Sequence, residues 1–174
     1  MGNDETTVGP FQIREPCGAD ALAMWQAVAA TAELDSNSWY CYLMLCTHFA
    51  GTCAVASDDS GLAGFVTGFA SGQDAGTWFV WQLWVRPDLR GRGVAARLAE
   101  HVLGAARSRF CAVQATVDPQ NLASMAFLRS LAGRRGAAMR VEPYLGADLF
   151  PAASGPHGRE DLVTLELLAR AVQA

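Results

Sequence analysis

An apolar run that ends before Pro87 and is followed by a glycine-bearing loop constrains the fold of this chain more than any other feature. The run covers residues 81–85, and the loop holds Gly91 and Gly93. Glycine has no Cβ, so the loop can bend tightly and a phosphate can approach its N–H groups. Helix-forming residues follow from 94 to 107, and the first amides of that helix would face the same anion. The sequence therefore predicts a strand, a pyrophosphate-binding loop and a helix.

Other loops that bind nucleotide phosphates do not fit this sequence. The pattern Gly-x-x-x-x-Gly-Lys-Ser/Thr is absent, and the chain contains no lysine at all. A dinucleotide-binding loop would place Gly-x-Gly-x-x-Gly near the start of a strand-helix-strand unit, and that pattern is also missing. The remaining alternative to a pyrophosphate loop is an ordinary glycine-rich turn between a strand and a helix.

Length and composition indicate one globular domain. The 174 residues are 51% hydrophobic, which is enough apolar surface for a single core. We expect residues 1–10 to form a disordered lead-in and residues 11–174 to form the domain. The formal net charge of −4 and the scattered arginines argue against nucleic acid as a partner. No apolar run reaches membrane-spanning length, so no membrane partner is expected.

The cysteines indicate a reducing, cytoplasmic setting. Their number is odd, and their spacing is neither Cys-x-x-Cys nor that of a zinc site. The first ten residues also lack the apolar segment of a signal peptide. We therefore expect no metal, and reduced thiols that pack in the core as small apolar residues. The five cysteines are Cys17, Cys41, Cys46, Cys53 and Cys111.

Hydrophobic periodicity and turn residues divide the chain into strands and helices. Strand character is found in residues 11–14, 52–57, 62–70, 77–85 and 112–117. Helical spacing is found in residues 22–29, 39–49, 94–107 and 122–131. Residues 133–156 are rich in Gly, Ala and Pro, and we expect a strand interrupted by a long loop there. Residues 160–171 are compatible with a helix, but a final strand over 162–167 is favoured.

The loop and several further segments resemble a known enzyme family. Arg90-x-x-Gly93-x-Ala95 resembles the acetyl-CoA loop of the GNAT acetyltransferase superfamily, whose pattern is Arg/Gln-x-x-Gly-x-Gly/Ala. Within that superfamily the chain resembles the diaminobutyrate acetyltransferases from Gln12 to about Leu167, except over residues 133–156. The segments that carry this resemblance are 34–42, 46–49, 79–82, 115–121 and the late pair His157 and Glu160.

This resemblance implies both a fold and an activity. The fold would be α/β (α+β), the GNAT fold, with a central mixed but mostly antiparallel sheet flanked by helices and strands that splay at the acetyl-CoA site. The activity would be transfer of acetyl from acetyl-CoA to the γ-amino group of L-2,4-diaminobutyrate, the first committed step of ectoine synthesis in osmoadaptation. The resemblance also implies a cytoplasmic enzyme and a homodimer. We further expect the amine to attack acetyl-CoA directly in a ternary complex.

The superfamily pattern also implies which residues contact acetyl-CoA. The backbone N–H of Leu83 or Trp84 would stabilise the tetrahedral oxyanion. Asn121 would bond the pantetheine arm, although an asparagine before a helix is also an ordinary N-cap, and both roles can hold together. The full set of expected cofactor-binding residues is Leu83, Trp84, Val85, Arg90, Gly91, Arg92, Gly93, Val94, Ala95, Asn121, Ser124 and Phe127.

Catalysis requires removal of a proton from the amine. An aliphatic ammonium with a pKa of ~10.4 is protonated at neutral pH and cannot attack a thioester. Glu160 beside His157 is the expected proton acceptor, directly or through water. Asp35 more plausibly holds an ammonium group by charge-assisted hydrogen bonding, although it remains a second candidate base. Either carboxylate could instead be a solvated loop residue or a helix cap.

Other polar and aromatic residues are expected to surround the short cationic substrate. Strand alternation places either Trp81 or Gln82 at the cleft. The expected substrate-binding residues are Asp35, Asn37, Ser38, Tyr40, Trp81, Gln82, Thr116 and His157. The sequence departs from the superfamily at Leu128, where many members have a tyrosine that protonates the leaving thiolate. We therefore expect that donor to be water or to be dispensable.

Two alternative functions remain open from the sequence. The first is acetylation of a different small amine or of a protein N-terminus. The second is a noncatalytic acyl-CoA sensor that keeps the loop but lacks a base.

Overall fold

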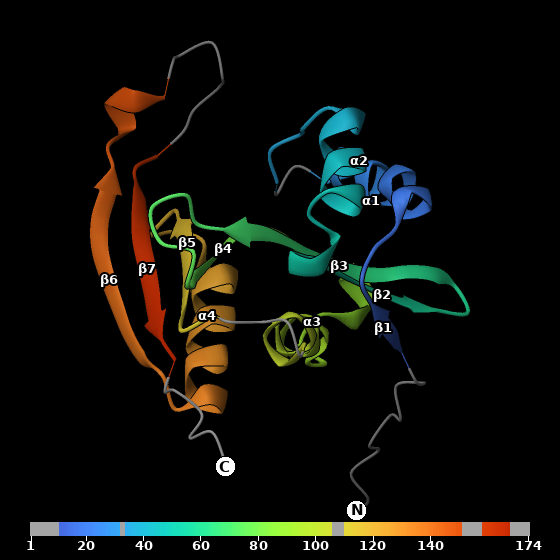
Figure 1. Ribbon diagram of the computed structural model, residues 1–174. Coiled ribbons are helices and arrows are strands. Elements are labelled where there is room, and N and C mark those ends of the chain that lie inside the picture. The colour runs from blue at the N-terminus through green and yellow to red at the C-terminus, as the bar shows by residue number, and fades with distance from the viewer. Residues whose placement is uncertain (1–10, 32–33, 106–109, 151–157, 168–174) are drawn as a thin grey trace, which may run out of the picture. The chain divides into compact units, whose positions relative to one another are not determined.

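The computed structural model describes residues 11–31, 34–105, 110–150 and 158–167 (Figure 1). The expected lead-in at residues 1–10 lies outside the described residues. The contacts divide the chain into two compact units. The first unit holds the described residues up to Thr67 together with Gln82–Ala105, and the second holds Gly68–Trp81 together with the described residues from 110 onward. Strands β3 and β4 begin in one unit and end in the other.

The elements alternate as the sequence predicts. The strands are β1 (Gln12–Arg14), β2 (Ala54–Asp58), β3 (Gly61–Ala70), β4 (Thr77–Val85), β5 (Ala112–Val117), β6 (Ala138–Leu145) and β7 (Glu160–Glu166). The α-helices are α1 (Ala21–Ala29), α2 (Trp39–Thr47), α3 (Val94–Gly104) and α4 (Leu122–Arg135). Short 3-10 turns include η3 (Pro87–Leu89) and η4 (Ala147–Leu149).

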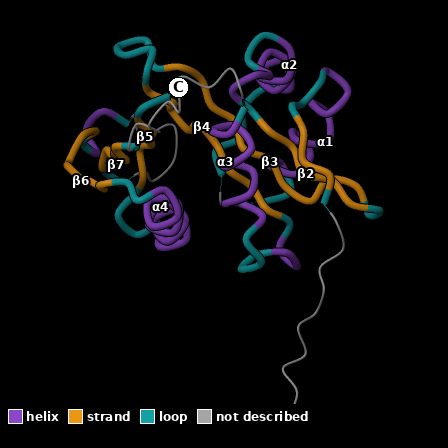
Figure 2. The backbone as a smooth tube through the Cα atoms, turned by 60° about the horizontal axis from the view of Figure 1, so that its bottom comes forward, coloured by secondary structure: helices purple, strands orange, loops and turns teal. Residues whose placement is uncertain are grey.

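Hydrogen bonds link the seven strands in the order β1-β2-β3-β4-β5-β7-β6. The pair β4 and β5 is parallel, while the pairs β1 with β2, β2 with β3, β5 with β7 and β6 with β7 are antiparallel. The last strand in chain order, β7, therefore lies between β5 and β6, as Figures 1 and 2 show. The mixed, mostly antiparallel sheet expected from the sequence is confirmed.

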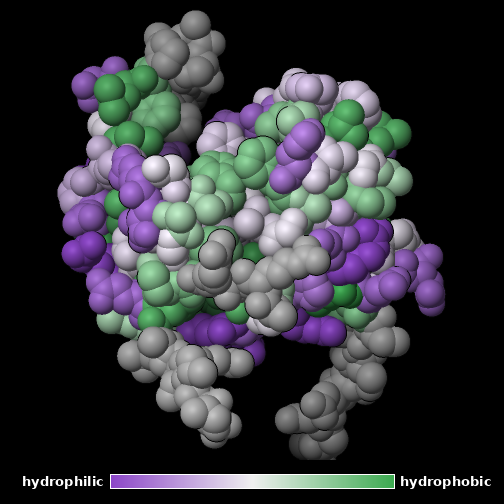
Figure 3. All heavy atoms as spheres, in the orientation of Figure 1, coloured by the Kyte–Doolittle hydropathy of each residue, from purple (hydrophilic) through white to green (hydrophobic). Residues whose placement is uncertain are grey.

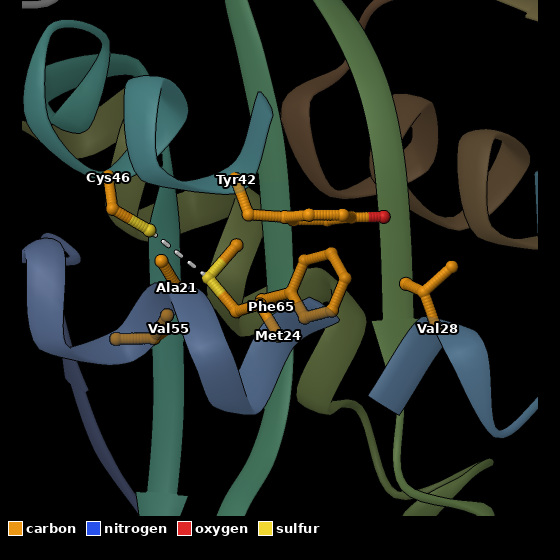
Figure 4. Packing of buried hydrophobic residues seen from close by; sticks show 7 residues of the cluster. All are labelled: Ala21, Met24, Val28, Tyr42, Cys46, Val55 and Phe65. Atoms are coloured by element: carbon orange, nitrogen blue, oxygen red, sulfur yellow. Dashed lines mark hydrogen bonds between the residues drawn. The ribbon is translucent and has the colours of Figure 1, made fainter. Parts of the chain in front are cut away.

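The first unit has helices on both faces of its sheet. Val55 of β2 and Phe65 of β3 are paired across the strands, and they pack with α1 and α2 in one buried cluster (Figure 4). On the opposite face Gly64 lies against Val94 and Leu98 of α3. Large side chains thus face the helix pair, while a glycine lets α3 approach closely. The apolar side chains of this cluster are buried between the two helices and the sheet, and their burial stabilises the packing of α1 and α2 on β2 and β3.

The buried cluster also determines the chemistry of one cysteine. Cys46 of α2 donates a weak hydrogen bond to the Met24 sulfur at 3.4 Å (Figure 4). Burial raises the pKa of the Cys46 thiol to about 12, so the thiol stays protonated and unreactive. The expectation that all five cysteines pack in the core was wrong for Cys17 and Cys111, which are exposed. Cys17 lies directly before a surface turn, and Cys111 lies directly before β5.

Two helix ends differ from the sequence expectation. The α4 helix continues to Arg135, beyond the expected end at residue 131, because Gly133 is accommodated within the helix. The helix ends at Gly136, whose φ of 60° lies in the left-handed region that terminates helices. The α3 helix ends at Gly104, before the expected end at residue 107. The expected strand in the 133–156 region is β6. Residues 151–156 of that region lie outside the described residues.

Gly68 of β3 has no room for a side chain. A Cβ at Gly68 would press on the fully buried Trp78 indole nitrogen and lie 2.5 Å from the Phe79 carbonyl oxygen. Neither group can move without disturbing the sheet. We therefore expect Gly68→Ala to lower the free energy of unfolding by about 1–3 kcal/mol, the usual range for overpacking.

Urea unfolding monitored by circular dichroism would measure this loss. The matched control is Gly72→Ala, because a Cβ at Gly72 meets no atom within 4 Å. The control should change stability by no more than about 0.5 kcal/mol in either direction. Equal unfolding midpoints for the two variants would contradict the packing that the structure shows at Gly68.

Candidate functional site

The loop after β4 begins at a fixed residue, Arg86. Its guanidinium donates to the two carboxylate oxygens of Asp58 at 3.1 and 2.6 Å and to Asp88 at 2.9 Å. Its backbone N–H donates to the Ala63 carbonyl at 3.0 Å. The Arg86 guanidinium also holds the pKa of the Asp58 carboxyl below its ordinary value, so this ion pair persists at neutral pH. The loop therefore leaves the sheet from a well-defined point.

The loop itself is shaped to present backbone amides. Gly91 and Gly93 have φ angles of 75° and 78°, which only glycine adopts without strain. Arg90 folds back, and its Nε donates to the Val85 carbonyl at 3.2 Å. Gly93 is the N-cap of α3, and being a glycine it supplies no side chain to bond the amides of the first turn. Those amides and the helix dipole are suited to bind an anion.

Strand β4 contains one more residue than the part of β3 with which it pairs. At one end the Ser71 N–H donates to the Thr77 carbonyl at 2.8 Å, and at the other the Arg86 N–H donates to the Ala63 carbonyl at 3.0 Å. Ala63 and Ser71 are eight positions apart, whereas Thr77 and Arg86 are nine apart. The extra residue makes a β-bulge in β4.

Gln82 lies on the first-unit side of this bulge, and the Thr67 side chain bonds both of its peptide groups. Its N–H donates to the Thr67 hydroxyl oxygen at 3.2 Å, and the Thr67 hydroxyl donates to its carbonyl at 3.3 Å. Successive residues of a strand direct their peptide groups to opposite edges. The Leu83 N–H therefore points away from β3.

Strands β4 and β5 pair near their amino-terminal ends. The β4 and β5 ladder covers only Thr77–Phe79 and Ala112–Gln114. The carboxyl halves of the two strands, which include Leu83, are outside the ladder.

The side chain of Gln82 fastens the segment before α2. The Tyr42 hydroxyl donates to Gln82 Oε1 at 2.9 Å, and Gln82 Nε2 donates to the Asp35 carbonyl at 2.8 Å. Tyr42 has no solvent exposure and Gln82 has 7%, so these bonds are shielded from water. Burial raises the pKa of the Tyr42 phenol, which therefore remains a donor. Both polar groups of the Gln82 amide are thus engaged within the protein.

The residues expected to bind the substrate lie along this fastened segment. Asp35, Ser38 and Tyr40 are exposed, and Asn37 is half-buried. Ser38 is also the N-cap of α2, and its Oγ accepts from the Cys41 N–H at 3.3 Å. The first unit therefore brings Asp35, Asn37 and Gln82 into one hydrogen-bonded neighbourhood.

In the second unit an aromatic group supports Trp81. The Phe69 ring lies 5.5 Å from the Phe79 ring and 6.0 Å from the Trp81 ring. Phe79 pairs with Gln114 of β5, so these side chains share one face of the sheet. Trp81 itself is 47% exposed and is available as an aromatic wall.

The same face carries two more of the expected residues. Thr116 of β5 is opposite Leu162 of β7, and Glu160 precedes Leu162 by two positions, so all three project to this face. Next along it, Gln114 Nε2 donates to Thr164 Oγ1 at 3.2 Å. The alternate residues, such as Val163, are buried on the face that α4 covers. The second unit thus brings Trp81, Thr116 and Glu160 to one face.

The remaining expected residues of the second unit lie on α4. Asn121 is the N-cap, and its Oδ1 accepts from the Ser124 N–H at 3.0 Å, which leaves its NH₂ group for other partners. Phe127 is half-buried, and Leu128 is 1% exposed in the core. A side chain at position 128 therefore serves packing here. The expected site residue His157 lies outside the described residues.

Known proteins resemble this chain over most of its length. The model described as the Acetyltransferase (GNAT) family matches residues 19–133. The chain belongs to the GNAT acetyltransferase family. The L-2,4-diaminobutyric acid acetyltransferase of Nocardia farcinica is 35% identical over 167 residues, covering 95% of this chain and 85% of the relative. That of Streptomyces coelicolor is 39% identical over 155 residues, covering 87% and 90%.

A solved structure of a GNAT enzyme has the same fold. The diaminobutyrate acetyltransferase EctA from Paenibacillus lautus, in complex with its substrate L-2,4-diaminobutyric acid and coenzyme A, superposes with a TM-score of 0.87. It is 28% identical, and the match covers 94% of this chain and 98% of that one. The GNAT fold expected from the sequence is confirmed.

Two residues of this GNAT site were missed by sequence reasoning. Tyr42 lies in a helix whose nine residues are almost all apolar, so the pattern does not distinguish it from the exposed Tyr40. Thr67 is the one hydroxyl residue within the buried run 63–68 of β3, and this isolated polar side chain was the available signal.

Two further properties concern only the residues that the structure describes. Among them, no group of three His, Cys, Asp or Glu side chains is arranged to hold a metal ion. None of their helices is long and apolar enough to cross a membrane.

Proposed function

We propose that this chain is an enzyme that transfers the acetyl group of acetyl-CoA to the γ-amino group of L-2,4-diaminobutyrate. The products are N-γ-acetyl-diaminobutyrate and CoA, and the reaction is the first committed step of ectoine synthesis. The observation that carries the proposal is the likeness, over nearly all of both chains, to a structure that contains diaminobutyric acid and coenzyme A. The anion loop and the bulged strand of this chain supply two features that the reaction needs.

Acetyl-CoA is the proposed co-substrate, and the residues that the family resemblance implies would hold it. The first-turn amides of α3, the loop from Arg90 to Ala95 and the exposed Arg92 suit the pyrophosphate. The backbone at 83–85 follows the part of β4 that pairs with β5. It suits the pantetheine amides, because it offers N–H and C=O groups on the side away from β3. Asn121, Ser124 and Phe127 of the second unit would complete the contacts.

Two steps of the reaction need groups that this chain supplies. Glu160, on the face with Trp81 and Thr116, is the proposed acceptor for the ammonium proton, directly or through water. Asp35 and the proposed ligand His157 would hold the substrate. The Leu83 N–H, turned away from β3, would donate to the oxyanion that forms when the amine attacks the thioester directly in a ternary complex.

Departure of the CoA thiolate needs no dedicated side chain in this proposal. The position at which many GNAT enzymes have a tyrosine holds Leu128, which is buried in the core. A thiol with a pKa of about 8.5 leaves readily as an anion, so water can supply the proton afterwards.

We further propose that residues 11–174 form a single N-acetyltransferase domain and that the enzyme works in the cytoplasm. The first proposal is supported by β3 and β4, which both units share. The second is supported by the free cysteines.

The substrate proposal predicts a clear order among amines. Purified protein should release thiol from acetyl-CoA fastest with diaminobutyrate, and more slowly with ornithine, lysine and spermidine. NMR of the product should place the acetyl group on the γ-nitrogen. A preference for another amine would overturn the substrate while leaving the fold and co-substrate intact. Tight acetyl-CoA binding without transfer to any amine would favour an acyl-CoA sensor.

The role of Glu160 predicts a specific kinetic defect. Glu160→Gln keeps the shape but cannot accept a proton, so kcat should fall by about 10²-fold or more. The KM for acetyl-CoA should stay within twofold of wild type. The matched control is Glu166→Gln, an exposed carboxylate at the other end of β7. Wild-type turnover in Glu160→Gln would leave Asp35 or water as the base.

A homodimer is proposed on the family resemblance and on one surface feature. β6 is a sheet edge, and Val141 and Leu149 near it are 44% and 62% exposed. Hydrophobic residues gather at the η4 end of this edge, while hydrophilic ones line the strand (Figure 3). An exposed sheet edge with apolar side chains favours association. Sedimentation at micromolar concentration should give twice the mass of the chain. A measured mass equal to that of one chain would overturn the proposed homodimer.

A further inference from the structure

Gln82 joins two parts of the first unit through separate groups. Its peptide groups are bonded by the Thr67 hydroxyl, and its side-chain amide is bonded by the Tyr42 hydroxyl and to the Asp35 carbonyl. We call these four residues the Gln82 network. The network connects α2, the segment that precedes it, β3 and β4 by four hydrogen bonds of 2.8 to 3.3 Å.

The network lies where polar groups are expensive to keep. Thr67 and Tyr42 have no solvent exposure, and Gln82 has 7%. Tyr42 packs edge-on against Phe65 in the apolar cluster, with ring centroids 6.4 Å apart (Figure 4). Burying hydroxyl and amide groups there is unfavourable unless each is bonded, and a fully bonded network fixes one geometry of its neighbours. An apolar core alone would not require these groups.

The two ends of the network are the two places where the proposed reaction needs precision. On the backbone side, the next residue after Gln82 is Leu83, whose N–H is the proposed oxyanion donor. On the side-chain side, the Asp35 carbonyl anchors residues 35–38, the proposed amine-binding segment. One residue therefore sets the position of both.

We propose that Tyr42 and Thr67 are positioning residues that act through Gln82. Tyr42 sets the place of the amine-binding segment, and Thr67 sets the orientation of the Leu83 N–H. Gln82 couples the two, so that the amine and the acetyl carbonyl are held in register. This inference rests on the proposed acetyl transfer to diaminobutyrate.

The network makes the two hydroxyls separable from the packing around them. Phenylalanine at position 42 keeps the ring that contacts Phe65 and removes the hydroxyl, which donates to Gln82 Oε1 and is also hydrogen-bonded with Asn37 of the proposed amine-binding segment. Valine at position 67 keeps the branched shape and removes the group that bonds both peptide groups of Gln82. In Tyr42→Phe the side-chain amide of Gln82 would turn to find a new partner, because a buried amide oxygen without a partner is unfavourable.

Steady-state kinetics with both substrates varied would test the two roles. Tyr42→Phe should raise the KM for diaminobutyrate roughly tenfold and leave the KM for acetyl-CoA within twofold, as loss of one buried hydrogen bond allows. Thr67→Val should lower kcat by roughly tenfold to a hundredfold, approaching the effect of losing an oxyanion donor. Thr67→Ser retains a hydroxyl and should restore most of kcat.

The coupling through Gln82 makes a further requirement on the double variant. Residues that act through one shared partner are not additive. The fall in kcat/KM for Tyr42→Phe with Thr67→Val should therefore be smaller than the product of the single effects. Thr47→Val is the matched control, because Thr47 is exposed and its hydroxyl bonds only within its own helix.

Each outcome decides between the inference and the function on which it rests. Failure of the wild-type protein to acetylate diaminobutyrate overturns both. An active wild type with unchanged kinetics in Tyr42→Phe and Thr67→Val overturns only the positioning roles. If both variants lost activity equally in all kinetic parameters, and in proportion to a fall in the thermal unfolding midpoint, the hydroxyls would only stabilise the fold. Product-like effects in the double variant would remove the coupling through Gln82.

Discussion

The geometry of β4 at the proposed site depends on two hydrogen bonds. They join the Thr67 hydroxyl to the N–H and to the carbonyl of Gln82. Before the bulge, the Thr77 carbonyl turns to β3, and after it the Arg86 N–H does so, although the two positions differ in parity. A regular strand would have kept odd residues on that side, and the Leu83 N–H would have been consumed in the β3 ladder. The bulge therefore turns the Leu83 N–H away from β3, and the Thr67 hydroxyl bonds both peptide groups of Gln82 at this irregular point.

Much of the fold could be predicted because local patterns specify it. The strands at 77–85 and 112–117 have the expected bounds, since each is an apolar run closed by turn residues or by proline. The end of α4 could not be predicted, because Gly133 suggests a stop that the helix does not need. The bounds of β6 could not be predicted, because this edge strand is exposed on much of both faces. It therefore lacks the alternation of apolar and polar residues by which strands are recognised.

The site divides along the same line between local and distant information. The loop from Arg90 to Ala95 is a local motif, so its glycines and helix start could be anticipated from spacing alone. Tyr42 and Gln82 are 40 positions apart, and Thr67 and Gln82 are 15 apart. Such pairs are set by how helices and strands pack, and no periodicity within one element reports them. Gln82 was expected to contact the substrate, whereas the structure engages its amide within the protein.

The insertion of β7 between β5 and β6 has a consequence for how the second unit assembles. β6 precedes β7 in the chain, and among the described strands it pairs with β7, whereas the ladder between β5 and β7 pairs Ala112 with Glu166 across more than fifty intervening residues. We expect closure of this long loop to be slower than formation of the β6 and β7 hairpin, whose pairs, such as Leu145 with Glu160, are closer in the chain. Glu160 begins the inserted strand. The proposed base would therefore reach its place near Thr116 only when β5 and β7 pair.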